Sequence, residues 1–306
     1  MSAPQDEWSE EEEKDSTLES LIESEDGLSD NQAIYQKHLS DPDPEVRALV
    51  IEGLWHYPDP VLIDPLMELA RHDPDPRVRN RAIVGMGRYV YEGEMAGYDY
   101  DWGEMGDIDM MYEDELPEAD YQRVVAFLLD IARDPSASLD EQRFSIEALG
   151  FSSEPEIADL LERAYQSPHL DMKASALFAM GRSGKTRWDS YVLAEIDSPE
   201  PQLQYEAVRA AGALFLDEAT HSLIRLASYA TDPDLRHEAI WALGHMTPLD
   251  AWQLLEDIAQ DPTEDDETRQ VAEVALEEYY LHQQMAEAEL EPFDEDEGGN
   301  GYFIER

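Results

Sequence analysis

A repeat of about 31 residues constrains the fold of this 306-residue chain more than any other feature. The motif DPDPEVR begins at Asp41, and DPDPRVR begins at Asp73. Apolar anchor residues then recur near the ends of seven segments with helical spacing: Leu54, Met86, Leu149, Met180, Ala211, Leu243 and Leu276. A second series of anchors follows in between: Leu66, Leu128, Leu160, Val192, Leu223 and Leu254. Such a period predicts helix pairs that bury their apolar faces against neighbouring pairs.

One step of the repeat is twice as long as the others. Met86 and Leu149 are 63 positions apart, whereas the other steps between first anchors measure 31 to 33. The extra length falls between the two helices of the second pair, because Met86 precedes Leu128 by 42 positions instead of 11 or 12. The sequence therefore predicts an insertion of one period at about residues 89–118.

Local signals mark where the first helix of each pair begins and ends. Asp43–Pro44 and Asp75–Pro76 place a carboxylate at the N-cap and a proline in the first turn. Glycines that favour helix termination follow five of the anchors, at Gly87, Gly150, Gly181, Gly212 and Gly244. Small residues that allow close helix packing precede the anchors, at Gly53, Gly85, Ala148, Ala179, Ala210, Ala242 and Ala275.

The pattern DPDPxVR…A…LG resembles HEAT repeats, specifically the short repeats of phycobilisome lyases, over roughly residues 40–284. The resemblance implies an all-α fold, an armadillo-type α-solenoid of about seven helix pairs. It also implies that a cation seven positions before each anchor joins a structural polar ladder between repeats. The residues at these positions are Arg47, Arg79, Lys173, Arg236 and Arg269, with Gln142 and Gln204 in two repeats.

The ends of the chain differ from the repeats in composition. Residues 1–30 carry 12 acids and one lysine, which predicts a disordered acidic segment. The solenoid is expected over 31–284, beginning with a capping helix at 31–39, and an acidic tail over 285–306. In the last pair Glu277 replaces the glycine, so the second helix is either separate or fused to the first.

The excess of acidic residues limits the classes of partner that the chain can bind. The chain has 72 Asp and Glu against 21 Lys and Arg, a net charge of −51, which disfavours nucleic acid and anionic membrane and favours a basic partner. There is no cysteine, which excludes thiol catalysis and thiolate metal sites. No signal peptide or membrane-spanning run is recognisable, so a cytoplasmic protein is expected.

No catalytic constellation stands out. GRSGKTRW, which begins at Gly181, lacks the spacing of a phosphate loop and is interpreted as a turn. His237 and His245 are expected to be structural, and the insertion's aspartates lack the spacing of a calcium loop. Trp188, Trp241 and Trp252 are expected in the core. No metal, cofactor or catalytic residue is therefore predicted.

The favoured function is a non-enzymatic protein-interaction scaffold that binds a basic or amphipathic protein. Residues 98–115 combine four aromatic residues and three methionines with eight carboxylates and no Lys, Arg or His. The predicted partner-binding residues are Tyr98, Tyr100, Trp102, Met110, Met111 and Tyr112. The alternative, implied by the resemblance alone, is a bilin lyase-like subunit.

Overall fold

The computed structural model describes residues 37–56, 58–95 and 116–290, with side chains up to residue 281. Within these ranges all regular secondary structure is helical. The chain divides into two compact units, Met1–Lys185 (unit 1) and Thr186–Arg306 (unit 2). The division falls after the first helix of the fourth predicted pair.

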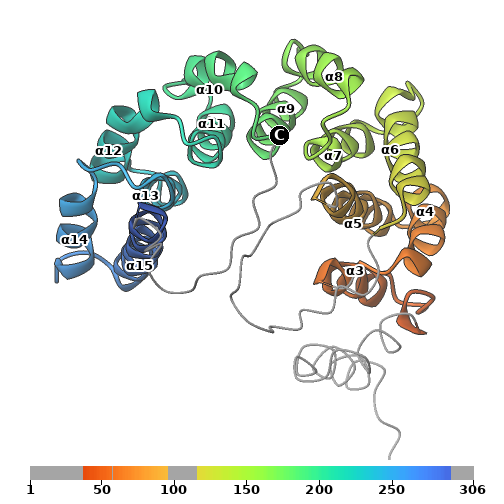
Figure 1. Ribbon diagram of the computed structural model, residues 1–306. Coiled ribbons are helices and arrows are strands. Elements are labelled where there is room, and N and C mark those ends of the chain that lie inside the picture. The colour runs from red at the N-terminus through yellow and green to blue at the C-terminus, as the bar shows by residue number, and fades with distance from the viewer. Residues whose placement is uncertain (1–36, 57, 96–115, 291–306) are drawn as a thin grey trace, which may run out of the picture. The chain divides into compact units, whose positions relative to one another are not determined.

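Unit 1 stacks helix pairs in two layers. Its first helices are α3 (Pro44–Gly53), α5 (Pro76–Met95), α7 (Leu139–Leu149) and α9 (Leu170–Arg182). Its second helices are α4 (Ile63–His72), α6 (Glu118–Arg133) and α8 (Pro155–Tyr165), and the short 3₁₀ helices η2 (Leu54–His56) and η3 (Pro60–Leu62) join α3 to α4. Each first helix packs against the next one, and α4, α6 and α8 cover one side of that layer (Figure 1).

Unit 2 repeats this arrangement. Its first helices are α11 (Pro201–Ala213), α13 (Pro233–Met246) and α15 (Asp266–Leu290). Its second helices are α10 (Asp189–Glu195), α12 (Thr220–Tyr229) and α14 (Trp252–Gln260), with the 3₁₀ helices η4 (Thr186–Trp188) and η5 (Asp217–Ala219) before α10 and α12. Continuous α15 decides between the two alternatives for the last pair: the helices are fused where Glu277 replaces glycine.

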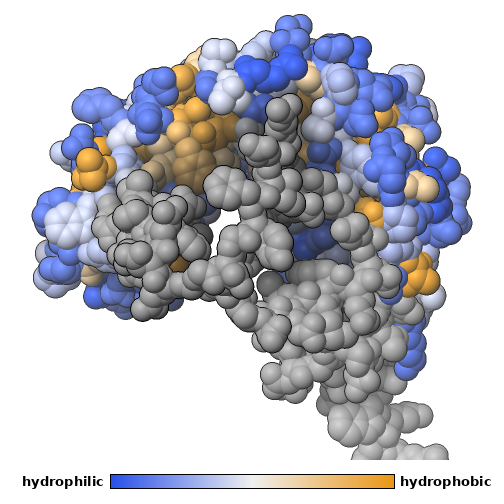
Figure 2. Space-filling model, in the orientation of Figure 1, coloured by the Kyte–Doolittle hydropathy of each residue, from blue (hydrophilic) through white to orange (hydrophobic). Residues whose placement is uncertain are grey.

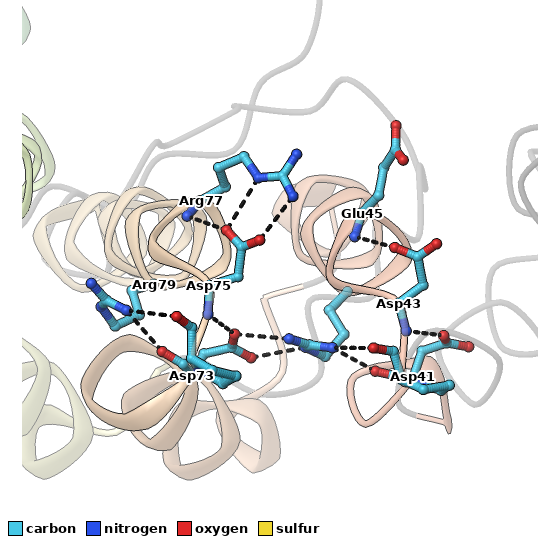
Figure 3. Close-up of polar contacts among 10 residues, drawn as sticks. Asp41, Asp43, Glu45, Asp73, Asp75, Arg77 and Arg79 are labelled. Carbon is cyan, nitrogen blue, oxygen red and sulfur yellow. Dashed lines mark hydrogen bonds and ion pairs between the residues drawn. The ribbon is translucent and has the colours of Figure 1, made fainter.

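The Asp-Pro motifs start the helices as predicted. The Asp43 carboxylate accepts a hydrogen bond of 2.8 Å from the Glu45 N–H, and Asp75 accepts one of 2.8 Å from the Arg77 N–H (Figure 3). These bonds satisfy N–H groups that have no partner inside the helix. The first aspartate of each motif in turn accepts from the backbone of the second, which fixes the loop that precedes the helix.

The end of α5 differs from the prediction. Helix α5 continues past Gly87 to Met95, so the first seven residues of the expected insertion, 89–95, are helical. Tyr89 and Val90 are buried, and the apolar face therefore extends beyond the glycine. Glycine lowers helix propensity by only about 1 kcal/mol, which such burial offsets. Residues 96–115 lie outside the described structure.

The glycines near the anchors serve packing between first helices more than termination. A Cβ added to Gly87 would lie 3.1 Å from the Cα of Ala148 on the next helix, and one added to Gly244 would lie 2.5 Å from the carbonyl oxygen of Ala275. The predicted close packing at the small residues before the anchors is thus confirmed for these two pairs.

The anchors form the core with two exceptions. The first series is buried from Leu54 to Leu243, but Leu276 is only half-buried. In the second series Leu254 is half-buried and its neighbour Leu255 is buried instead, so the predicted register of α14 is wrong by one residue.

Candidate functional site

The predicted polar ladder is confirmed for Arg47 and Arg79, and its role is structural. The Arg47 guanidinium donates two hydrogen bonds of 2.8 Å to the Asp73 carboxylate and one of 2.7 Å to the Asp41 carbonyl (Figure 3). Arg79 donates to Glu141 of the next pair at 2.7 Å and to the Asp73 carbonyl at 2.9 Å. The hydrogen bond with Asp73 raises the pKa of Arg47. Each arginine ties two successive loops together.

The ladder continues into unit 2 at Arg236, which donates to both carboxylate oxygens of Glu264, at 2.8 and 2.6 Å. The other predicted positions differ in their contacts. Gln142 and Gln204 donate to carbonyls of the loops that precede their own helices, Lys173 lies 4.6 Å from the centroid of the Tyr165 ring, and Arg269 pairs with Asp266 on its own helix.

Two arginines of the second helices in unit 1 pair with acids. Arg123 bonds Asp64 and Asp120, and Arg133 donates to Glu156 at 2.6 Å.

One cavity lies wholly within unit 2. It is a groove of about 1020 Å³ between α11, α12, α13 and the start of α15. Its lining includes Tyr205, Tyr229, Glu238, Trp241 and Val271. Figure 2 shows apolar residues gathered around α11, among hydrophilic ones. The groove thus joins aromatic surface to carboxylates.

Neighbouring helices hold the polar side chains of this groove. The Tyr205 hydroxyl on α11 donates to Glu238 on α13 at 2.8 Å. Burial and the hydrogen bond to the Glu238 carboxylate raise the pKa of Tyr205 to about 12, which keeps the phenol protonated as a donor even in alkaline solution. His237 Nε2 lies 2.9 Å from the hydroxyl of Thr268 on α15. The groove is therefore pre-organised by bonds between repeats.

Three rings lie in contact beside the groove. The His245 ring lies nearly parallel to Trp241, with 5.0 Å between ring centroids, and its centroid lies 4.7 Å from that of Phe215 at an interplanar angle of 37°. His245 Nδ1 lies 2.6 Å from a carboxylate oxygen of Glu278. The three rings therefore extend the aromatic surface from α13 to the end of α11.

Phe215 has an unusual backbone conformation. Its φ is +53°, in the left-handed region where a bulky side chain is strained, and 53% of the residue is exposed. The corresponding positions one repeat before and after are Gly184, at φ +60°, and Thr247, at φ +52°. Glycine is the favoured residue for such a helix end. Phe215 is thus a bulky, exposed residue at a position where the preceding repeat has glycine.

The balance of acidic and basic residues differs between unit 2, which holds the groove, and unit 1. Residues 186–290 contain 23 acids and 5 Lys and Arg, whereas the described part of unit 1 contains 23 acids and 14 Lys and Arg. Of the five, Arg225 lines the groove but pairs with Asp197. Asp232 and Asp234 lie at the groove's rim. The surface suits cationic side chains that also have apolar stems.

The structure does not cover the predicted partner-binding residues. Tyr98, Tyr100, Trp102, Met110, Met111 and Tyr112 all lie outside the described residues. In the part of the chain that the structure covers up to residue 281, no group of three potential metal-binding side chains occurs, and His237 and His245 bond Thr268 and Glu278 instead.

The tryptophan prediction is correct only in part. Trp188 is buried in the core of unit 2. Trp241 lines the groove, and Trp252 is half-buried and donates to the Tyr280 hydroxyl at 2.8 Å. Sequence reasoning missed the groove as a site. One signal in the sequence could have pointed to it. Gly184 follows the first helix of its repeat, and one repeat later the corresponding position holds the bulky Phe215.

Comparisons with known proteins identify the repeat. A family model described as HEAT repeats matches residues 32–95 and 190–277. Among solved structures, a chain of the CpcE–CpcF phycocyanin lyase complex from Nostoc sp. PCC7120 is similar at 16% identity, with a TM-score of 0.54, and covers 87% of this chain and 97% of that one. No curated protein matches.

Two further structures are similar at lower scores. Human deoxyhypusine hydroxylase has 17% identity and a TM-score of 0.38 over 89% of this chain and 97% of that one. A chain of the Kap95:Nup1 complex has 13% identity and a TM-score of 0.46, over 89% of this chain and 39% of that one. At 16% identity, the similarity to the phycocyanin lyase chain shows the fold alone. No helix in the described ranges is long and apolar enough to cross a membrane.

Proposed function

Because the chain is a HEAT-repeat protein, we propose that it is a non-enzymatic scaffold whose unit 2 groove binds a basic, amphipathic segment of another protein. HEAT repeats are typical of protein-interaction scaffolds. The observation that carries the proposal is the coincidence of exposed aromatic rings with an excess of carboxylates in unit 2.

The chemistry of the groove defines the segment that it fits. The face of Trp241 attracts a lysine or arginine head group, which contributes about 0.5–2 kcal/mol depending on desolvation. The carboxylates around it accept hydrogen bonds from the same cation. Phe215 and Tyr229 offer apolar contact, as their rings are exposed. A segment with cations on one face and leucine-like residues on the other meets both requirements.

A pair of synthetic peptides tests the proposal on the full chain. One amphipathic peptide carries lysine and leucine in helical spacing, and its control carries glutamate in place of lysine. The lysine peptide is expected to bind, and Trp241→Ala to weaken binding about tenfold, as for a central aromatic contact. Isothermal titration calorimetry at two salt concentrations measures affinity and charge dependence.

Trp252→Ala is the matched control, because Trp252 lies on α14 and does not line the groove. It should leave the affinity unchanged. Equal binding of the lysine peptide to wild type and to Trp241→Ala would refute the groove as the site.

The insertion remains a second proposed contact with the partner. Tyr98, Tyr100, Trp102, Met110, Met111 and Tyr112 supply aromatic and methionine side chains of the kind that anchor interfaces. The test is removal of 96–115 only. Residues up to Met95 belong to α5, where Glu94 accepts a hydrogen bond of 2.7 Å from the Ser153 N–H. Unchanged peptide affinity in that variant would exclude a contribution from the insertion.

The alternative function, a bilin lyase-like subunit, has one supporting similarity. The phycocyanin lyase structure is similar in fold at 16% identity. Mixing the chain with several bilins and recording absorbance spectra separates the two functions. A spectral shift that depends on the chain favours the lyase-like function, and constant spectra favour the scaffold.

A further inference from the structure

Helix α5 of unit 1 presents a stripe of arginines on its face away from the second helices. Arg77, Arg81 and Arg88 recur at helical spacing, and the side chains of Arg77 and Arg81 are 67% and 52% exposed. A cavity of about 410 Å³ lies along this stripe and is lined by α3, α5 and Phe144 of α7. In a chain of net charge −51, this concentration of arginines is local.

The arginines of the stripe all pair with neighbouring carboxylates, and the pair of Arg81 is the most exposed of the three. Arg77 pairs with Asp75 of its own cap, Arg81 lies 3.5 Å from Glu52, and Arg88 lies 2.5 Å from Glu92. The Arg81–Glu52 pair is exposed on both sides and contributes about 0–1 kcal/mol, so another carboxylate exchanges with it easily.

Two polar atoms of α5 lack a partner. The Asn80 Oδ1 and the Arg88 Nε are buried and make no hydrogen bond within the described structure. Asn80 lines the cavity. Buried polar atoms of native proteins are nearly always bonded, so these two atoms leave one acceptor and one donor available on this helix.

Aromatic rings continue the stripe beyond Arg88. The Arg88 guanidinium lies 5.1 Å from the centroid of the Tyr91 ring, and Tyr91 packs edge-on against Phe151. The guanidinium of Arg182 lies 4.7 Å from the Phe151 ring and 4.1 Å from the Phe178 ring. This alternation of guanidinium groups and rings fits a segment that has both carboxylates and aromatic side chains.

The net charge of the chain favours a segment of the same chain over a separate molecule as the ligand of the arginine stripe. A separate acidic segment is repelled by the chain at long range, whereas a tethered one has an effective concentration on the order of millimolar. Residues 96–115 follow α5 directly and hold eight carboxylates, four aromatic residues and three methionines. A segment of this length spans about 65 Å when extended, about twice the roughly 30 Å length of α5.

We propose that the arginine face of α5 binds residues 96–115 of the same chain. Carboxylates of the segment pair with Arg77, Arg81 and Arg88, and its rings pack with Tyr91 and Phe151. This contact lies wholly within unit 1 and does not depend on the groove of unit 2. A partner that uses the insertion has to compete with it.

The test uses a full-length variant in which a glycine-serine linker of equal length replaces 96–115. A fluorescein-labelled peptide with the sequence of 96–115 is titrated with this variant and with the intact chain, and anisotropy is recorded at low and moderate salt. The peptide is expected to bind the linker variant and to bind the intact chain at least tenfold more weakly, because there the face is already occupied.

Paired substitutions in the linker variant locate the contact. Arg77→Ala with Arg81→Ala is expected to weaken peptide binding at least tenfold. The control, Arg133→Ala with Arg163→Ala, removes the same charge from exposed positions on α6 and α8 and should have no such effect. Circular dichroism checks that each variant keeps its helices.

Three results would overturn the proposal. The first is no binding of the peptide to the linker variant, and the second is equal loss of binding in both arginine pairs. The third is equal binding by a peptide of residues 291–306, which is also acidic. That result would show that binding depends on negative charge alone. Sedimentation of the intact chain as a dimer that dissociates in the linker variant would instead assign the segment to a second copy.

Discussion

The two units use one repeat but differ in how far their acids are balanced by bases. Their described parts contain equal numbers of acids, 23 each, but unit 1 has 14 Lys and Arg and unit 2 has 5. Among the described residues, the exposed large apolar side chains of unit 1 are Val61 and Leu170. Those of unit 2 are Phe215, Tyr229, Leu249, Val274, Tyr280 and Leu281.

This difference separates what stacks the helices from what is left for a partner. Both units keep the small residues between first helices and an arginine clamp between loops. Unit 1 has further arginines on the exposed face of α5, and these pair with neighbouring carboxylates. Unit 2 leaves carboxylates and rings in excess, which is the composition that attracts a cationic, amphipathic segment.

The largest expected difference concerns the clamps. Arg47→Ala should lower the free energy of unfolding by about 3–5 kcal/mol, because the Asp73 carboxylate, with a side chain only 3% exposed, loses its partner inside the protein. Arg236→Ala should cost less, about 1–2 kcal/mol, since water reaches Glu264, whose side chain is 22% exposed. Urea denaturation followed by circular dichroism measures both values.

The double variant Arg47→Ala with Asp73→Asn is the control for this comparison. It removes the unpaired charge and should recover part of the loss. Equal costs for the two single substitutions would mean that burial does not distinguish the clamps.

The next effect concerns the glycines between first helices. Gly244→Ala should destabilise unit 2 by about 1–3 kcal/mol, since the new methyl group would lie 2.5 Å from a backbone oxygen of α15. Gly87→Ala in unit 1 should change stability by less than about 1 kcal/mol, because the gain in helix propensity offsets a milder overlap at 3.1 Å. Thermal unfolding of the two variants gives the comparison, and a larger loss for Gly87→Ala would contradict it.

The sequence predicted the features that repeat. Cap aspartates such as Asp43 and small residues such as Ala148 follow from local propensity and from the period, and both behave as expected. The fused α15 was one of two alternatives, and Glu277 pointed to it. These features depend on neighbours at fixed spacing, which one sequence contains.

The sequence did not predict the features that depend on which surface the neighbours leave open. Trp241 has the helical spacing of a core residue, yet it lines the groove, because the helices around it do not cover it. Helix α5 continues beyond Gly87 because Tyr89 and Val90 are buried, which the spacing of apolar residues alone does not reveal. The partner-binding residues predicted in the insertion stay a prediction.

Substitutions at two corresponding positions, Phe215 after α11 and Gly184 after α9, measure the backbone strain at Phe215. Phe215→Gly should stabilise the protein by about 1 kcal/mol, because glycine adopts positive φ without a Cβ clash, but it should weaken binding of the lysine peptide. Gly184→Ala in unit 1 should destabilise by about 1 kcal/mol, since a Cβ there meets open space and only the backbone strain counts. Urea denaturation and calorimetry separate stability from affinity.

A loss of stability in Phe215→Gly would show that the ring contact with His245 outweighs the strain. The phenylalanine would then be explained by folding alone, and the argument for its role in binding would fail.

The smallest effect is the pH dependence of the clamps. The hydrogen bond from Arg236 lowers the pKa of Glu264. Burial alone would raise the pKa of Glu141, but the hydrogen bonds from Arg79 and Ser138 outweigh it and lower the pKa. A lowered folded-state pKa gives stability that is present above the unfolded value, about 4.3, and is lost as the pH falls through the folded value. The stability difference between wild type and Glu264→Gln should therefore shrink as the pH falls from 6 to 3.

The matched substitution in unit 1, Glu141→Gln, should show the same trend, because its carboxylate is also held by an arginine. Taking each difference against wild type at the same pH matters most for unit 2. There, protonation also relieves repulsion among many unpaired acids, which by itself stabilises the fold and opposes the loss of the clamp. Thermal unfolding at each pH measures the differences. A wild-type advantage over Glu264→Gln that stays constant down to pH 3 would mean that the clamp in unit 2 does not act through the ionised carboxylate.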